Sequence, residues 1–305
     1  MKTYIVGHKN PDTDSIVSAI LFANILGEGA EPARQGDINK ETEYLLDKFG
    51  FEIPIILPTG SRNIVLVDHN SIEEGPSDLK PEEVVALYDH HKLGGPRTTE
   101  LIPVRIEKVG CTATLASIIY GEKAIVPSTG LASIAIGAII SDTINLTSPT
   151  TTEYDREAIT ELNKVAKLDV DELAQAMFTA KSDISDISTE DLIGKDYKVF
   201  EMAGQKVGIG VWETVLPETV LDREDEIVKM LAKKKVEEAL DCIFFVVVDI
   251  LHNGCVFVLL GDREREVAEA AFKKSTNGNL MQCDGIVSRK KQITPQIETY
   301  LASKK

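Results

Sequence analysis

The stretch GHKNPDTDS (residues 7–15) follows a short apolar run, TYIV at residues 3–6, and precedes a longer one, SIVSAILFANIL at residues 15–26. The first run is typical of a strand, and the second of a helix that begins at Ser15 and ends before Gly27. An ordinary strand-to-helix turn also contains Asp, Asn and Pro, because these residues shape turns and cap helices. However, His8, Asp12 and Asp14 place three ionisable side chains within seven positions. This turn is therefore a candidate site as well as a cap.

The same alternation of strand and helix continues through the first half of the chain. NIVLVDH (63–69) and VVALYDHH (84–91) are β-branched and almost continuously apolar, as strands buried on both faces are. Helix-length segments rich in small or amphipathic residues follow at 110–121, 130–143 and 153–168. Alternating strands and helices predict an N-terminal α/β domain with a mainly parallel sheet flanked by helices.

A polar, Ser-rich and acidic segment, KSDISDISTEDLIGKD (181–196), interrupts this pattern and is interpreted as a linker with a short helix. We expect domains at 1–187 and 195–305, joined by a hinge at 188–194, because 305 residues exceed a typical single domain. The second domain is expected to be a smaller α/β unit. Its predicted elements are a strand at 206–214, a helix at 217–240, a hairpin of 242–251 with 255–261 that turns at HNG, and a helix at 264–274. The apolar positions assigned to the long helix are Val228, Leu231, Ala232, Val236, Ala239 and Leu240.

Composition narrows the class of protein. The net charge of −16 disfavours DNA or RNA as a partner, whereas a small anion can still bind a local cluster of cations. No apolar run approaches the ~18–20 residues of a membrane span, and the N-terminus does not resemble a signal peptide. The four cysteines are scattered without metal-ligand spacing, so reduced and buried thiols in a cytoplasmic protein are expected. They are Cys111, Cys242, Cys255 and Cys283.

Four of the five histidines fall in three motifs, GHKNPDTD, VDHN and YDHH, each at the carboxyl end of a predicted strand. That edge of a parallel sheet is where ligands bind. A further acid, Asp142, ends the apolar segment IAIGAIISDT. Imidazole with carboxylate suits Mn²⁺, Co²⁺, Fe²⁺ or Zn²⁺. The four carboxylates would neutralise two dications ~3.5–4 Å apart, which could share a bridging hydroxide as a nucleophile for phosphorus. These carboxylates are Asp12, Asp14, Asp68 and Asp142.

The second domain contains a basic cluster, SRKKQ (288–292), in an otherwise acidic chain. Arg289 offers a bidentate fork and Lys290 and Lys291 offer point charges, so the cluster is interpreted as a phosphate clamp rather than a solvated loop. Lys198, just past the linker, could reach the same substrate from another side. His252 is interpreted as a turn residue, and Trp212 as part of the core or of an interface.

Taken together, GHKNPDTDSI, VDHN, YDHH, GCTAT, SDT and SRKKQ, in this order, resemble the motifs of the manganese-dependent family II inorganic pyrophosphatases in the DHH phosphoesterase superfamily. The resemblance spans the whole chain. It implies hydrolysis of pyrophosphate to two orthophosphates in a cleft between the domains, with two Mn²⁺ (or Co²⁺) per subunit, an additional Mg²⁺ that arrives with the substrate, and a homodimer joined through the N-terminal domain.

The resemblance also assigns residues. One metal is expected on His8, Asp12, Asp68 and Asp142, and the other on Asp14, Asp68, His90 and Asp142. His91 is expected beside the phosphate, while Lys198, Arg289 and Lys290 grip pyrophosphate as the second domain closes. One departure is Glu73, in DHNSIEEG, where family members carry Gln. It bears on the environment of His91 and not on the metal ligands.

Two other functions remain open from the residues. Another DHH phosphoesterase would cleave short RNA, bisphosphorylated adenosine or a cyclic dinucleotide, but those enzymes carry a Gly-rich nucleotide motif that the second half of this chain lacks. A non-catalytic, metal-stabilised binding protein would keep the acids and lose part of the basic clamp, which here is complete.

Overall fold

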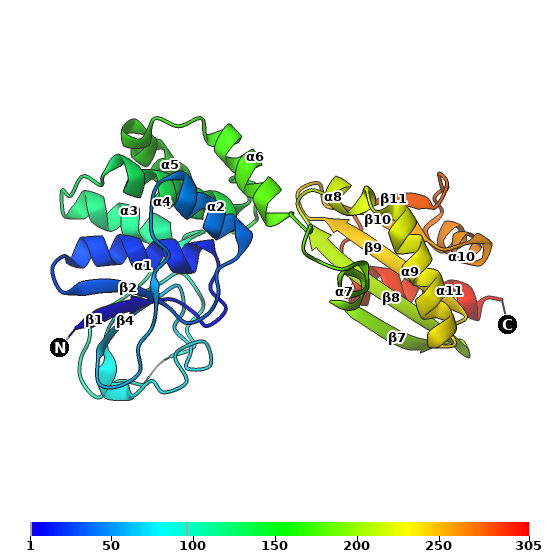
Figure 1. Cartoon of the computed structure of the whole chain (residues 1–305), viewed down its shortest axis with the longest axis horizontal. Helices are drawn as coiled ribbons and strands as arrows, with labels where there is room; N and C mark the ends of the chain where they lie inside the picture. Colours follow the sequence, from blue (N-terminus) through cyan, green and yellow to red (C-terminus); the bar gives the residue numbers. More distant parts are fainter. Residues whose placement is uncertain (1, 96, 305) are drawn as a thin grey trace. The chain divides into compact units, whose positions relative to one another are not determined.

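The computed structural model describes residues 2–95 and 97–304 (Figure 1). The chain forms two compact units, Met1–Lys181 and Ser182–Lys305, each with its own sheet. The boundary lies a few residues before the expected one at 187. The segment 188–194, expected to be a hinge, is mostly helix α7 (Thr189–Gly194), whose Leu192 and Ile193 are fully buried in the core of the second unit. Burial of these two side chains explains why the segment belongs to that unit.

The first unit is built on a six-stranded parallel sheet in the order β3-β2-β1-β4-β5-β6. The order reverses between β1 and β4, the type of position at which open parallel sheets bind ligands. In the central strands β1, β4 and β5 most side chains are buried and none is exposed, which explains their largely β-branched and apolar sequences. The strands are β1 (Thr3–Val6), β2 (Ala30–Arg34), β3 (Ile55–Ile56), β4 (Asn63–Val67), β5 (Val84–Asp89) and β6 (Val104–Ile106).

The helices of this unit are stacked in layers: α1 packs on β1 and β2, α4 packs on α1, and α5 packs on α4 (Figure 1). Helix α1 begins at Thr13, two residues before the expected start, because the Asp12 side chain accepts a hydrogen bond from the backbone of Ser15 and caps the helix. The helices are α1 (Thr13–Leu26), α2 (Lys40–Lys48), α3 (Thr112–Glu122), α4 (Thr129–Thr143), α5 (Glu153–Ala166) and α6 (Val170–Lys181), with a 3₁₀ turn at Pro81–Glu83.

The second unit has a five-stranded mixed sheet in the order β11-β10-β9-β8-β7, in which only β8 and β9 are parallel. The expected hairpin is confirmed as β9 and β10, and Asn253 in its turn has a φ of +51°. The other helices and strands of this unit are β7 (Tyr197–Met202), β8 (Gln205–Thr214), α8 (Glu218–Leu221), α9 (Glu224–Glu237), β9 (Cys242–Asp249), β10 (Gly254–Leu259), α10 (Asp262–Phe272), β11 (Leu280–Asp284), a π-helical turn at Arg289–Ile293 and α11 (Thr294–Ala302).

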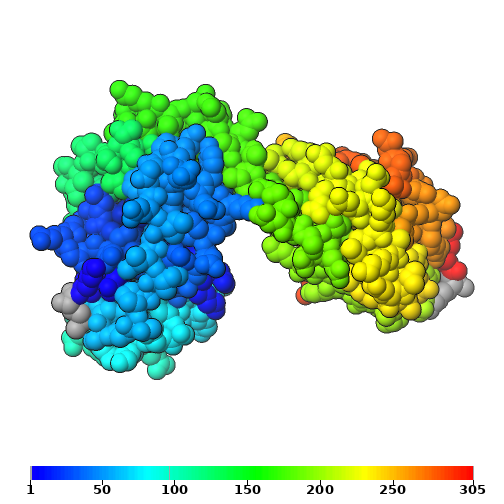
Figure 2. Space-filling view, in the orientation of Figure 1, coloured from blue at the N-terminus to red at the C-terminus, as the bar shows by residue number. Residues whose placement is uncertain are grey.

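The prediction of a single long helix at 217–240 is wrong. The chain forms α8 and α9 instead, and Arg223 between them donates a hydrogen bond to the backbone carbonyl of Ile187. The face of α9 that meets the core carries Ile227 and Leu231, whereas Val236 is 81% exposed. Helix α9, yellow in Figure 2, lies on the surface seen there.

Other expectations for single residues hold. Trp212 is buried, His252 is an exposed turn residue, and all four cysteines are free and buried. Among the described residues, no helix is both long and apolar enough to cross a bilayer.

Candidate metal centre

Strand ends of the first unit bring the three sequence motifs to one edge of the sheet. His8 follows β1, Asp68 follows β4, and His90 follows β5. Asp68 has a φ of +59°, a left-handed conformation that Asp tolerates better than most residues and that turns the chain sharply as β4 ends. Asp14 lies in the first turn of α1, and Asp142 in the last turn of α4.

The six expected metal ligands converge around the Asp68 carboxylate. His8 Nε2 lies 3.3 Å from Asp68 Oδ2, and His90 Nε2 lies 3.4 Å from Asp68 Oδ1. His8 Nε2 is also 3.5 Å from Asp12 Oδ2, while His90 Nε2 is 3.7 Å from Asp142 Oδ2 and 3.9 Å from Asp14 Oδ2. Three overlapping groups could each hold a cation: His8 with Asp12 and Asp68; Asp14 with Asp68, His90 and Asp142; and Asp68 with His90 and His91.

The tautomer of His90 fits a metal ligand. Its Nδ1 lies 3.1 Å from the carbonyl oxygen of Val109, which can only accept a hydrogen bond, so Nδ1 carries the proton. Nε2 is buried and has no hydrogen-bond partner among the described residues. Metal-binding histidines are held in this way, with one nitrogen donating to a carbonyl or carboxylate and the other facing the ion.

Electrostatics also favour a cation at this place. Burial and the neighbouring Asp68 carboxylate raise the pKa of Asp14 to about 7. The pKa of Asp142 lies well above its usual range because the group is buried close to Asp14 and Asp68. Burial opposes the charged form of His8 and His90, yet the negative charge of the surrounding carboxylates raises their pKa values to about 10 and about 9. Protons therefore balance crowded negative charge, a role that divalent cations would fill more strongly.

Asp14 is held by a helix terminus that the sequence analysis did not connect to it. Its Oδ2 accepts a 2.6 Å hydrogen bond from the backbone N–H of Thr112, and its Oδ1 accepts hydrogen bonds from Ala113 N (2.9 Å) and Ser18 Oγ (2.8 Å). Thr112 begins α3, so the positive end of that helix faces a buried carboxylate. The GCTAT motif (110–114) was the available sequence signal, but its spacing alone indicates no role.

A second buried acid, Asp155 of α5, fixes the backbone of this motif. It accepts hydrogen bonds from Gly110 N at 3.0 Å and from Thr114 Oγ1 at 2.6 Å, and it also accepts from Thr152 at the start of its own helix. Asp155 thus positions the loop that presents Thr112 to Asp14.

His91 lies at the exposed edge of the ligand cluster. Its side chain is 53% exposed, and its Nδ1 lies 2.9 Å from Asp89 Oδ1 and 3.8 Å from Asp68 Oδ1. His91 lines a pocket of about 450 Å³ together with His8, Asp68 and Lys92, so this open space adjoins the ligand cluster. Glu73 contributes its backbone carbonyl, which accepts a 2.8 Å hydrogen bond from Lys9 Nζ.

The expected clamp residues all belong to the second unit. Lys198 on β7 and Lys290 are exposed. The Arg289 side chain donates hydrogen bonds to the backbone carbonyl of Asp196 and, at 2.6 Å, to its Oδ1, with a third contact at 3.3 Å to the carbonyl of Ile209. The guanidinium is therefore already paired within its own unit.

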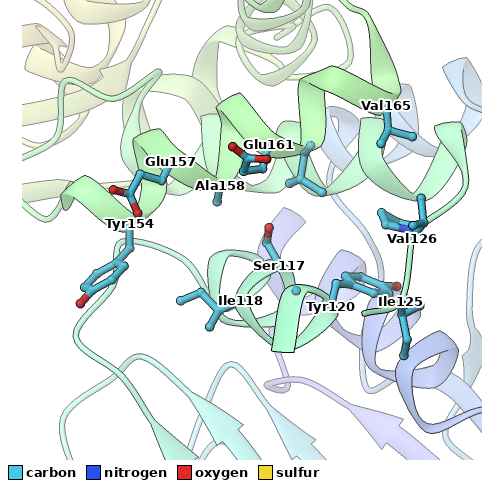
Figure 3. A pocket seen from close by; sticks show the side chains of 13 residues that line it. Ser117, Ile118, Tyr120, Ile125, Val126, Tyr154, Glu157, Ala158, Glu161 and Val165 are labelled. Atoms are coloured by element: carbon cyan, nitrogen blue, oxygen red, sulfur yellow. The ribbon is translucent and has the colours of Figure 1, made fainter. Parts of the chain in front are cut away.

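A different pocket, of about 370 Å³, lies between α3 and α5 and is mainly apolar (Figure 3). Ile118 and Ser117 project into it from α3, opposite Ala158 and Glu161 of α5 (Figure 3). None of the expected site residues lines it. The chemistry suggested by the motifs is therefore concentrated at the sheet edge.

Comparison with known proteins gives a consistent set of relatives. The profile of the DHH family N-terminal domain matches residues 2–139, and that of the DHHA2 domain matches residues 175–300. A "Probable manganese-dependent inorganic pyrophosphatase" of Bacillus licheniformis is 40% identical over 98% of this chain and 99% of its own length. The manganese-dependent inorganic pyrophosphatase of Methanocaldococcus jannaschii is 39% identical over 97% and 98%. A crystal structure of a candidate family II inorganic pyrophosphatase from Methanococcus jannaschii is similar with a TM-score of 0.64 and 38% identity, covering 98% of this chain and 99% of that one.

Proposed function

The chain belongs to the manganese-dependent inorganic pyrophosphatases of the DHH family, and from that premise we propose that it hydrolyses inorganic pyrophosphate to two orthophosphates. The observation that carries the proposal is the convergence of two histidines and four carboxylates at the sheet edge, where His90 Nε2 is buried without a hydrogen-bond partner among the described residues.

We assign two divalent cations to this cluster, preferably Mn²⁺. His8, Asp12, Asp68 and Asp142 would hold the first, and Asp14, Asp68, His90 and Asp142 the second, so that Asp68 and Asp142 bridge. Two groups of side chains that lie within ligating distance of one another support this division in part: His8, Asp12 and Asp68 form one, and Asp14, Asp68, His90 and Asp142 form the other, whereas the place of Asp142 on the first cation comes from the family resemblance. Four carboxylates balance the four positive charges of two dications. When bound, such a pair lowers the pKa of a water molecule and neutralises phosphate oxygens.

The chain's own residues would bind and orient the substrate. His91, exposed beside the ligand cluster, would donate a hydrogen bond from Nε2 to a phosphate oxygen. Lys198, Arg289 and Lys290 of the second unit would neutralise the remaining phosphate charge. Arg289 would exchange its Asp196 partner for the bidentate phosphate contact that its fork favours.

Three further features belong to the same proposal. Pyrophosphate would enter as its Mg²⁺ complex. The protein would form a homodimer through its first unit, which light scattering can measure. Four buried free cysteines fit a reducing compartment, so the cytoplasm is the expected location.

The deciding experiment measures phosphate release from pyrophosphate after chelation and after single metals are restored. We expect Mn²⁺ or Co²⁺ to restore turnover, bisphosphorylated adenosine to yield no phosphate, and cyclic dinucleotides to remain uncleaved. A metal-loaded protein inert towards pyrophosphate would contradict the proposal. So would an Asp68→Ala variant that retains near-wild-type, metal-dependent turnover.

A further inference from the structure

We propose that Asp89, the first residue of the DHH motif, is a positioning residue that is fixed by Asn70 and that orients the His91 imidazole so that its Nε2 faces the substrate. The DHH pattern points to roles for His90 and His91, whereas the spacing of Asp89 and Asn70 indicates none. The inference rests on the proposed function for its substrate, but the geometry that carries it is independent of any bound ion.

Asp89 is fully buried, and both of its carboxylate oxygens are engaged. Oδ1 accepts hydrogen bonds from His90 N at 2.7 Å, from His91 N at 3.1 Å and from His91 Nδ1 at 2.9 Å. Oδ2 accepts a hydrogen bond from Asn70 Nδ2. A carboxylate with this many donors accepts a proton reluctantly, and accordingly its pKa lies below the usual range, because the hydrogen bonds from His91 and Asn70 outweigh its burial.

Asn70 uses all of its hydrogen-bonding capacity to fix this arrangement. Its Nδ2 donates to Asp89 Oδ2 and, at 3.0 Å, to the carbonyl of Lys92. Its Oδ1 accepts hydrogen bonds from the backbone N–H groups of Gly94 and Gly95. An amide offers two donors and two acceptor positions, so none is left over. One buried side chain therefore fixes both the Asp89 carboxylate and the loop that follows His91.

The consequence for His91 is a defined ring orientation. Because Asp89 only accepts hydrogen bonds, Nδ1 of His91 must carry a proton, and Nε2 is the nitrogen left to act on a ligand. With the ring charged, Nε2–H is a hydrogen-bond donor beside the pocket that His91 shares with Lys92. The same contact argues against His91 as a metal ligand through Nδ1, since that atom is 2.9 Å from Asp89 and 3.8 Å from Asp68.

The first test needs no substitution. Nitrogen-15 NMR of histidine-labelled, metal-free protein, at a pH where His91 is neutral, reports which ring nitrogen keeps its proton. We expect the Nδ1–H tautomer for His91. The Nε2–H tautomer would overturn the proposal, whether or not the protein hydrolyses pyrophosphate.

The second test is a double-mutant cycle in the manganese-loaded enzyme. Asp89→Asn places an amide N–H₂ where the carboxylate accepts hydrogen bonds from Asn70 and His91, so the His91 ring loses its fixed orientation. We expect kcat to fall roughly 10- to 100-fold while the Mn²⁺ affinity changes less than about threefold. In a His91→Gln background the same substitution should cost less than about twofold more, because its effect acts through His91. If the kcat losses of Asp89→Asn and His91→Gln multiply in the double variant, Asp89 does not act through His91. A fall in Mn²⁺ affinity as large as the fall in kcat would likewise show a merely structural role.

The chain provides a matched control. Asp249 accepts a hydrogen bond from His252 Nδ1 at 2.7 Å in the exposed β9–β10 turn, which is the same kind of pair outside any proposed site. Asp249→Asn should leave kcat unchanged. If Asp89→Asn does not fold, the smaller change Asn70→Ser tests the same relay. We expect that variant to mix the His91 tautomers, and a single unchanged Nδ1–H form would contradict the role of Asn70.

Discussion

The backbone N–H of Thr112, the first residue of helix α3, donates a 2.6 Å hydrogen bond to Asp14 Oδ2, although 98 residues separate the two in the chain. The helix terminus offers its partial positive charge to a carboxylate that is fully buried and close to two others. Even so, the pKa of Asp14 remains raised, to about 7, because burial and Asp68 outweigh the hydrogen bonds. Without ions, repulsion between these buried carboxylates therefore destabilises their charged forms.

Asp142→Asn should stabilise the metal-free protein and abolish its activity. The raised pKa of Asp142 means that the folded state prefers the protonated acid, so ionisation destabilises the fold as the pH rises above the unfolded value of ~3.9. The neutral amide removes this penalty but also removes a ligand. We expect a higher melting temperature in chelator at neutral pH, little further increase on addition of Mn²⁺, and turnover reduced more than about 100-fold. Asp47→Asn, on the exposed face of α2, is the control and should change neither.

Manganese binding should strengthen as the pH rises and should release protons at pH 7. In the metal-free protein His8 and His90 have pKa values of about 10 and about 9, so both rings carry two protons at neutral pH. A ligating nitrogen must lose its proton, so protons compete with the metal below those values. Calorimetric titrations in two buffers of different ionisation enthalpy should give different apparent enthalpies. Identical enthalpies in both buffers would show that no proton leaves.

The sequence predicted which side chains would gather at this edge of the sheet, because their positions follow local patterns. Apolar runs identified β1, β4 and β5, and the polar residues directly after them had to meet at one edge of a parallel sheet. His8, Asp68 and His90 needed no tertiary information beyond that rule. The groups that hold the ligands could not be found in this way, because the contact of Thr112 with Asp14 and of Asn70 with Asp89 joins residues far apart in the sequence.

The fold was predicted less well where local propensity and packing disagree. Strand β2, with the sequence AEPAR, has no apolar run and contains Pro32, so pairing with β1 and not composition makes it a strand. The expected helix at 217–240 was assigned by apolar spacing that includes Val236, yet that side chain is exposed and Ile227 faces the core instead. When a segment contains several apolar side chains, more than one face of the helix could pack against the core, and tertiary contacts decide which one does.

Asp155→Ala should destabilise the first unit and weaken metal binding together. The buried carboxylate accepts hydrogen bonds from Gly110, Thr114 and Thr152, and its loss leaves buried donors without partners, at about 1–3 kcal/mol each before relaxation. Urea unfolding should show a loss of about 2–4 kcal/mol. Because the freed loop carries Thr112, the Mn²⁺ affinity should fall too. Asp155→Asn, which keeps part of the hydrogen bonding, should fall between the wild type and Asp155→Ala in both measurements.

The pairing of Arg289 with Asp196 predicts that substitutions of these two residues change the KM for pyrophosphate in opposite directions. Asp196 Oδ1 accepts a 2.6 Å hydrogen bond from the guanidinium group of Arg289. If Arg289 binds phosphate, the Asp196 carboxylate therefore competes with the substrate for that group. Asp196→Asn weakens this competitor, while the backbone carbonyls of Asp196 and Ile209 still hold Nη1, so the KM for pyrophosphate should fall several-fold. Arg289→Lys keeps the charge and loses the fork, so KM should rise about tenfold or more, with a smaller change in kcat.

Exposed Lys291 supplies the control for this last pair, because it lies in the same basic cluster and carries the same charge two positions along the chain, whereas the family resemblance gives contacts with pyrophosphate only to Arg289 and Lys290 of this cluster. Lys291→Ala should change KM less than about twofold, the scale of a screened surface charge. Steady-state kinetics of the three variants with manganese-loaded enzyme provides the comparison. An increase in KM for Asp196→Asn would mean that the carboxylate orients Arg289 for the substrate instead of competing with it. Equal effects of Arg289→Lys and Lys291→Ala would remove Arg289 from the clamp altogether.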